Sequence, residues 1–177
     1  MISTLKQALF SLFFPPVCPF CKETKKSTNY FCFSCMQTIE LSLEKKQTEN
    51  SIQIYCFEDI EPMRSFFSSL TKEKHPKKIE LAVSFFLLQL HQHKIEDIEL
   101  IYCPHKRSSV YYTLSKNLSK KLQLPLVKTL DSCKDKSTLL LGKVSSIPSK
   151  AHCYVLTFLK SEFERDNDSI KKALPIS

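Results

Sequence analysis

The hydrophobic and polar positions of the chain follow two periods, one of two residues and one of about 3.6, and these predict its strands and helices. Strands are predicted where apolar residues alternate or run together over a short stretch: 52–57, 98–103 and 152–158. Helices are predicted where apolar residues recur every three or four positions: 3–14, 60–70, 77–93, 110–122 and 166–174. The helix at 77–93 contains ELAVSFFLLQL and is apolar almost all round, which indicates burial against a sheet.

The order of these elements predicts the fold class. Strands that alternate with long helices are joined by crossovers, and crossovers pair strands in parallel. We therefore expect an α/β domain over residues 51–177, with 125–130 as a further strand and 132–150 as a loop. The polar segment 44–50 (EKKQTEN) is expected to be a linker. Residues 1–45 form a separate N-terminal part, made of the helix at 3–14 and a cysteine-rich ribbon.

Four of the eight cysteines carry the clearest chemical signal. They form the pairs CPFC and CFSC, with ten residues between the pairs: Cys18, Cys21, Cys32 and Cys35. Two CxxC pairs let four thiolates converge on one tetrahedral ion, which is typical of a structural zinc ribbon. A shell closed by four sulfurs leaves no position for water, so zinc here would supply folding energy and no catalysis. The alternatives are a pair of disulfides or idle thiols.

The other four cysteines indicate whether the protein works in an oxidising or a reducing compartment. Cys56, Cys103 and Cys153 stand singly within predicted strands, and Cys133 stands in a predicted loop beside a lysine. This scatter favours a reducing environment and small buried residues over a disulfide framework. The apolar run near the N-terminus superficially resembles a signal sequence, but no stretch approaches the roughly 20 apolar residues of a membrane span. We expect a cytoplasmic protein.

The net charge of +8 comes entirely from the second half of the chain. Residues 1–103 hold 12 basic and 12 acidic residues, whereas residues 104–177 hold 14 basic and six acidic ones. Such asymmetry favours an anionic partner, with nucleic acid as the first candidate. The candidate nucleic-acid-binding residues are Lys106, Arg107, Lys116, Lys120 and Lys121, with Tyr111 or Tyr112 for base stacking. The alternative is a solvated, lysine-rich surface with packed tyrosines.

Glycine usage limits the chemistry. Gly142 is the only glycine in the chain. Loops that cradle phosphates bring several backbone N–H groups against the anion and usually need glycine at closely spaced positions. The sequence therefore argues against Walker-type and dinucleotide-type loops, and it also lacks GxSxG and HExxH motifs.

Several motifs, taken in order, resemble the ComF family of competence proteins. They are the opening LFFPPVCPFC, the second CxxC pair, the strand and turn IYCPHK, and a lysine-rich helix followed by LPLVKTL. The resemblance implies a zinc ribbon followed by a phosphoribosyltransferase-like α/β domain with a mainly parallel sheet. It also implies a cytoplasmic role in DNA uptake by natural transformation, with single-stranded DNA and a competence helicase or DNA-processing protein as partners.

Two departures from the family pattern bear on catalysis. Family members commonly have an arginine-rich loop after the turn at Cys103, where this chain has only Lys106-Arg107-Ser108-Ser109. They also have two aspartates and a Thr-Thr-Gly turn at the phosphoribosyl pyrophosphate loop, where this chain has Thr157 and Phe158 and no glycine. We therefore expect a protein that handles single-stranded DNA without catalysis. The alternatives are a phosphoribosyltransferase with an altered loop and a scaffold on which the ribbon docks a partner protein.

Overall fold

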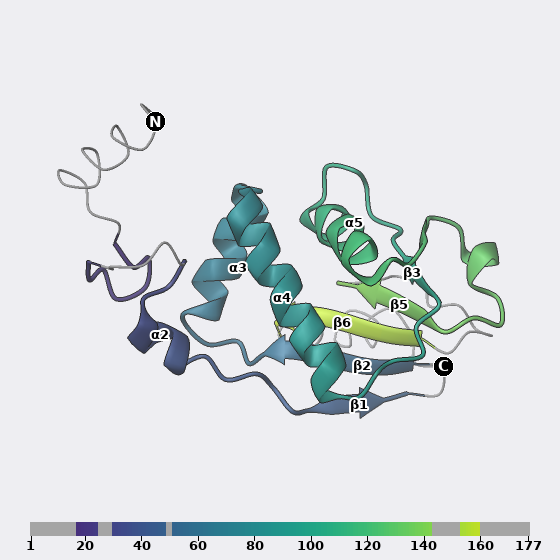
Figure 1. Ribbon diagram of the computed structural model, residues 1–177, viewed down its shortest axis with the longest axis horizontal. Coiled ribbons are helices and arrows are strands. Elements are labelled where there is room, and N and C mark those ends of the chain that lie inside the picture. The colour runs from purple at the N-terminus through teal and green to yellow at the C-terminus, as the bar shows by residue number, and fades with distance from the viewer. Residues whose placement is uncertain (1–16, 25–29, 49–50, 143–152, 160–177) are drawn as a thin grey trace, which may run out of the picture. The chain divides into compact units, whose positions relative to one another are not determined.

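The computed structural model describes residues 17–24, 30–48, 51–142 and 153–159 (Figure 1). The chain divides into two compact units, Met1–Glu40 and Leu41–Ser177. The predicted helices at 3–14 and 166–174 lie outside the described residues. Among the helices that are described, none is long and apolar enough to cross a bilayer.

The second unit has the expected α/β architecture. Its elements in chain order are β1 (Lys45–Gln47), β2 (Ser51–Phe57), α3 (Met63–Lys72), α4 (Pro76–Gln92), β3 (Leu100–Tyr102), α5 (Val110–Leu122), β4 (Leu126–Val127), the 3-10 turn η1 (Leu130–Cys133), β5 (Thr138–Leu141) and β6 (Cys153–Leu159). The strands form one sheet in the order β1-β2-β6-β5-β3-β4. Only β1 is antiparallel to its neighbour, and the other pairs are parallel. The predicted mainly parallel sheet is confirmed.

Local signals set the ends of the two long helices. Pro76 occupies the first turn of α4, and the Lys77 backbone N–H donates to the ring of His75, its N-cap. Ser109 caps α5 by accepting from the Tyr111 backbone N–H at 3.2 Å. At its other end α5 stops where Gln123 adopts a left-handed conformation with φ of 58°.

Two predictions about irregular segments are wrong. The predicted linker at 44–50 contains β1, which pairs with β2 from Lys45↔Ile54 to Gln47↔Ile52. The predicted loop at 132–150 contains β5, which lies between β3 and β6 and is buried at all four positions. The polar edge strand β1 forms because its neighbour β2 offers hydrogen bonds. The strand β5 shows no alternation of apolar and polar residues, because both of its faces are buried inside the parallel sheet.

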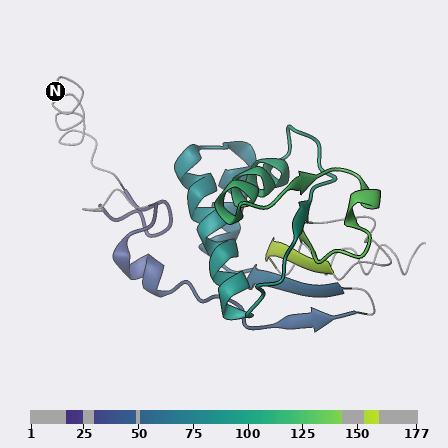
Figure 2. The same ribbon diagram turned by 45° about the vertical axis from the view of Figure 1, so that its right-hand side comes forward.

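One face of the sheet carries a cluster of phenylalanine rings. Figure 1 and Figure 2 show α3, α4 and α5 on the same side of the sheet. On that side Phe158 of β6 is fully buried, and its ring centre lies 5.0–6.4 Å from those of five other phenylalanines: Phe57, Phe66, Phe67, Phe85 and Phe86. Rings from two strands and two helices therefore form the centre of the core.

The opposite face of the sheet holds a second group of buried residues that pack together. Leu100 and Tyr102 of β3, Leu140 of β5 and Val155 of β6 are buried there with two cysteines, Cys133 of η1 and Cys153. Burial raises the pKa of both thiols, to about 11 for Cys153. Cys56 and Cys103 are also buried. Cys56, Cys103 and Cys153 are thus the small buried residues that the sequence predicts, and Cys133, placed in a loop by the sequence, is buried as well.

Three polar contacts tie distant segments of this unit together. The buried amide of Gln89 donates to the carbonyls of Ser42 at 3.0 Å and Cys56 at 3.1 Å. The Tyr154 hydroxyl donates to Asp97 Oδ1 at 3.0 Å. Burial, followed by this hydrogen bond and the Asp97 charge, raises the pKa of Tyr154. Each contact joins segments more than 30 residues apart, so each restrains the tertiary fold.

Gly142 stands where a side chain would not fit. It follows β5 with φ of +77°, and an added Cβ would come within 2.6 Å of the Tyr111 ring. Its backbone N–H donates to the Leu156 carbonyl at 2.7 Å. The His105 ring stacks on the Tyr111 ring with 5.2 Å between their centres, and His105 Nε2 lies 2.9 Å from the Leu141 carbonyl oxygen. The single glycine thus permits close packing at the carboxyl edge of the sheet.

Candidate metal centre

The described part of the first unit consists of two short segments that each carry a cysteine pair. Residues 17–24 form a hairpin closed by the antiparallel bridge Val17↔Thr24, with the Cys18 N–H donating to the Glu23 carbonyl at 2.8 Å. Lys22 adopts φ of 65° in this turn. The second segment leads into the short helix α2 (Phe33–Gln37), whose N-cap is Cys32. Each pair therefore sits on a tight turn that points two sulfurs the same way.

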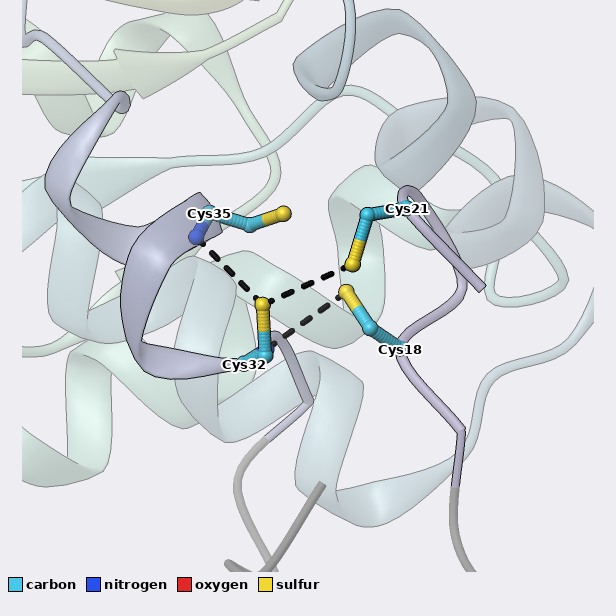
Figure 3. A group of neighbouring side chains, drawn as sticks. All are labelled: Cys18, Cys21, Cys32 and Cys35. Atoms are coloured by element: carbon cyan, nitrogen blue, oxygen red, sulfur yellow. Dashed lines mark hydrogen bonds between the residues drawn. The ribbon is translucent and has the colours of Figure 1, made fainter. Parts of the chain in front are cut away.

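The two segments bring all four predicted ligands together, and Figure 3 shows the sulfurs facing a common centre. Every Sγ atom lies within 4.8 Å of the others. The Cys21 and Cys32 sulfurs are 3.6 Å apart. Four sulfurs at 2.3 Å from a tetrahedral ion would be separated by about 3.8 Å, so the cluster has the dimensions of a metal site. A disulfide needs sulfurs about 2.05 Å apart, and all four cysteines are free.

Backbone N–H groups point at the sulfurs. The Cys32 N–H donates to Cys18 Sγ at 3.5 Å, and the Cys35 N–H donates to Cys32 Sγ at 3.4 Å. Burial raises the pKa of Cys18, but hydrogen bonds from the Cys32, Cys21 and Phe20 backbones outweigh it and lower the pKa to about 6. Burial, with the neighbouring thiols, raises the pKa of Cys35 to about 12. The unit thus favours the thiolate form of Cys18 and the protonated form of Cys35. Binding of a cation would displace the proton of Cys35.

One residue beside this centre, Glu23, was not predicted from the sequence. A carboxylate oxygen of Glu23 lies 3.8 Å from Cys21 Sγ, within reach of its thiol proton. The spacing of CxxC pairs predicts ligands but not the groups beside them, because those depend on the turn that follows each pair.

The five predicted nucleic-acid-binding residues are all exposed but do not form one cluster. Lys106 and Arg107 lie in the turn that precedes α5, whereas Lys120 and Lys121 lie in its last turn. At 1.5 Å per residue the two ends of this helix are about 18 Å apart. Lys116 lies between them, one helical turn before Lys120.

The two tyrosines of this region have different surroundings. The Tyr111 ring packs on Phe67 and His105, as expected under the alternative in which this tyrosine is a packed side chain. Tyr112 has the Lys128 ammonium 4.9 Å from its ring centre, which places an aromatic face beside a basic group that the sequence did not single out. The region offers positive charge along α5 and two half-buried tyrosines, of which Tyr112 lies beside a lysine.

No protein-family model matches the sequence, and no curated protein matches it. The observations that bear on function are therefore those of the structure: a four-sulfur cluster suited to a metal ion, an α/β unit with a mostly parallel sheet, and exposed basic residues along α5.

Proposed function

We propose that the chain is a ComF-like competence protein with a structural zinc ribbon and a phosphoribosyltransferase-like unit that assists cytoplasmic handling of single-stranded DNA during natural transformation, without catalysis. The observation that carries the proposal is the cluster formed by Cys18, Cys21, Cys32 and Cys35. It supports the zinc ribbon with which the resemblance to that family begins. Zinc is the expected ion because four thiolates in a tetrahedral arrangement are its preferred structural site.

The surroundings of Phe158 support a role without catalysis. In the family pattern two carboxylates stand at positions 157 and 158, where they would contact a ribose. Here Thr157 is almost fully buried, and Phe158 is enclosed by the rings of α3, α4 and β2. A buried aromatic ring at this position offers no carboxylate to a ribose. The turn that would hold the phosphate follows β6 and lies outside the described residues.

The basic residues along α5 supply the nucleic-acid surface in this proposal. Binding of single strands to lysine and arginine releases counterions, so affinity should fall with salt at a slope of about −0.7 for each phosphate contacted. If all five predicted residues contact phosphates, the slope of log K against log salt should be roughly −3.5. An aromatic face at Tyr112 would add stacking.

Fluorescence anisotropy with a labelled oligodeoxythymidine at several salt concentrations tests this surface. Replacing Lys106, Arg107, Lys116, Lys120 and Lys121 by glutamine should weaken binding and flatten the salt slope. A matched control replaces five exposed lysines outside the region with glutamine: Lys45, Lys46, Lys72, Lys77 and Lys94. Binding that ignores salt, or equal losses in the two variants, would show that this surface is not the DNA site.

Calorimetry with phosphoribosyl pyrophosphate and magnesium tests the enzymatic alternative. The proposal expects no heat of binding at millimolar ligand, because Phe158 fills the place of the carboxylates. Saturable heat that disappears on replacing a residue at the carboxyl edge of the sheet would instead favour a phosphoribosyltransferase with an altered loop.

A scaffold role has a specific observation in its favour. Three apolar side chains around the cysteine cluster are exposed, Val17 at 51%, Phe20 at 41% and Phe33 at 76%. Exposed aromatic residues are typical anchors of protein interfaces. A purified competence helicase should bind the wild-type chain and lose affinity for a Phe33→Ser variant that keeps its zinc. Equal binding by the two chains would remove this second candidate.

A further inference from the structure

The four sulfurs of the metal centre differ in their access to solvent. Cys18, Cys35 and Cys32 are 0%, 6% and 9% exposed, whereas Cys21 is an exposed residue at the end of its turn. Bound zinc would hold all four sulfurs as thiolates, so ionisation would not distinguish them. Access then decides which sulfur meets a dissolved oxidant first.

The exposed sulfur also has a partner for a disulfide. Cys21 Sγ lies 3.6 Å from Cys32 Sγ, and in Figure 3 the two side chains point toward each other from separate turns. A disulfide requires about 2.05 Å between sulfurs, so closing the bond needs an approach of roughly 1.5 Å. The two residues are 11 positions apart and belong to different cysteine pairs, so such a bond would join the two knuckles.

We propose that Cys21 is an oxidation site at which a hydroperoxide forms a Cys21–Cys32 disulfide and releases the metal ion. This inference rests on the zinc site proposed above. The first unit then acts as a peroxide-sensitive element whose two turns stay joined after the ion has left.

The reaction balances with hydrogen peroxide, the simplest hydroperoxide, as the two-electron oxidant. The Cys21 thiolate attacks one peroxide oxygen, the O–O bond breaks, and hydroxide leaves while the sulfur becomes a sulfenic acid. The Cys32 thiolate then attacks that sulfur, forming the S–S bond and expelling a second hydroxide. Protons from solvent convert both hydroxides to water. The centre has lost two of its four thiolates, and the remaining pair holds a divalent ion much more weakly.

Limited oxidation of the full, zinc-loaded chain tests the proposal directly. Hydrogen peroxide is added below one equivalent, released zinc is followed with a chromogenic chelator, and remaining thiols are blocked with N-ethylmaleimide before peptide mapping. We expect one zinc ion released for each disulfide, and a Cys21–Cys32 crosslink as the first product. A first disulfide within one CxxC pair, or first oxidation at a buried cysteine of the second unit, would overturn the inference.

Two matched variants supply a kinetic test. Histidine also binds zinc in three-cysteine structural sites, so Cys21→His and Cys35→His each keep four ligands while removing one thiol. Cys21→His should slow peroxide-driven zinc release by roughly tenfold or more, because the accessible thiolate is gone. Cys35→His should release zinc at close to the wild-type rate. The reverse order of the two rates would refute Cys21 as the site of attack.

The zinc content of the untreated chain distinguishes failure of the proposed zinc ribbon from failure of the proposed oxidation site. A purified wild-type chain without stoichiometric zinc would refute the proposed ribbon itself. A chain that holds zinc but yields a different first disulfide would leave the ribbon in place and refute only the oxidation site.

Discussion

Replacing Phe158 with alanine should be among the most damaging single changes in the α/β unit. The side chain is fully buried, and its ring lies near five other phenylalanine rings. The closest of them, Phe67, stacks on it with an interplanar angle of 17°. Because those neighbours come from β2, α3 and α4, the cavity left by alanine would open among three elements and could not close by moving one of them.

Truncation of a buried phenylalanine to alanine costs about 3–5 kcal/mol, through lost transfer energy and the cavity left behind. The upper half of that range applies here, because aromatic pairs add about 0.5–1.5 kcal/mol beyond their buried area. A domain of this size has a total stability of about 5–15 kcal/mol, so a large share would be lost. Phe158→Leu keeps much of the apolar volume and should cost only about 1–2 kcal/mol.

Urea unfolding followed by far-ultraviolet circular dichroism measures the effect. With a slope of about 2 kcal/mol per molar, the midpoint of Phe158→Ala should fall by roughly 2 M. Leu88→Ala on α4 is the matched control, since Leu88 is 50% exposed and should change the midpoint little. A Phe158→Ala midpoint within the error of that control would refute the claim that this ring organises the core.

Three further predictions concern polar and backbone contacts of the same unit. Gln89→Ala should cost about 1–3 kcal/mol in urea unfolding, because buried carbonyls lose their donor, whereas Gln92→Ala at an exposed position of the same helix should be nearly neutral. Gly142→Ala should lower the free energy of unfolding by about 2–4 kcal/mol, because of the positive φ and the clash with Tyr111. A Tyr111→Ala background should reduce that loss, and an unchanged loss would contradict the clash. Burial and the acidic partner Asp97 raise the pKa of Tyr154, so the stability that its protonated hydroxyl contributes is complete below about pH 10 and is lost as the pH rises through the native pKa. Tyr154→Phe should therefore make the fall of thermal stability above pH 10 shallower, and an unchanged fall would contradict this assignment.

The sequence predicted well those features whose signal is local. The stripe of leucines four residues apart predicted α5, which spans Val110–Leu122 as expected. The two CxxC pairs predicted the four-sulfur cluster, since a turn of four residues needs no distant contact to orient its thiols. The predicted ends of the helix at 77–93 differ by a single residue from those of α4, because Pro76 fixes its start.

Features that depend on residues far away in the chain could not be predicted from the sequence. β5 reads as four residues between polar segments, and it is a strand because β3 and β6 flank it. β1 consists of Lys-Lys-Gln, which has no intrinsic preference for a strand, and it forms by pairing with β2. The ring cluster around Phe158 draws on residues from 57 to 158, so no local window contains it.

The position of β6 has a consequence for synthesis of the protein. It lies between β2 and β5 although it follows every other described strand in the chain, so those two have no common neighbour until residue 159 leaves the ribosome. Until then the growing polypeptide exposes unpaired apolar strand edges, the kind of surface that chaperones cover and that otherwise aggregates. A nascent chain that stalls before β6 should therefore behave as a chaperone client, however complete the helices upstream of it are.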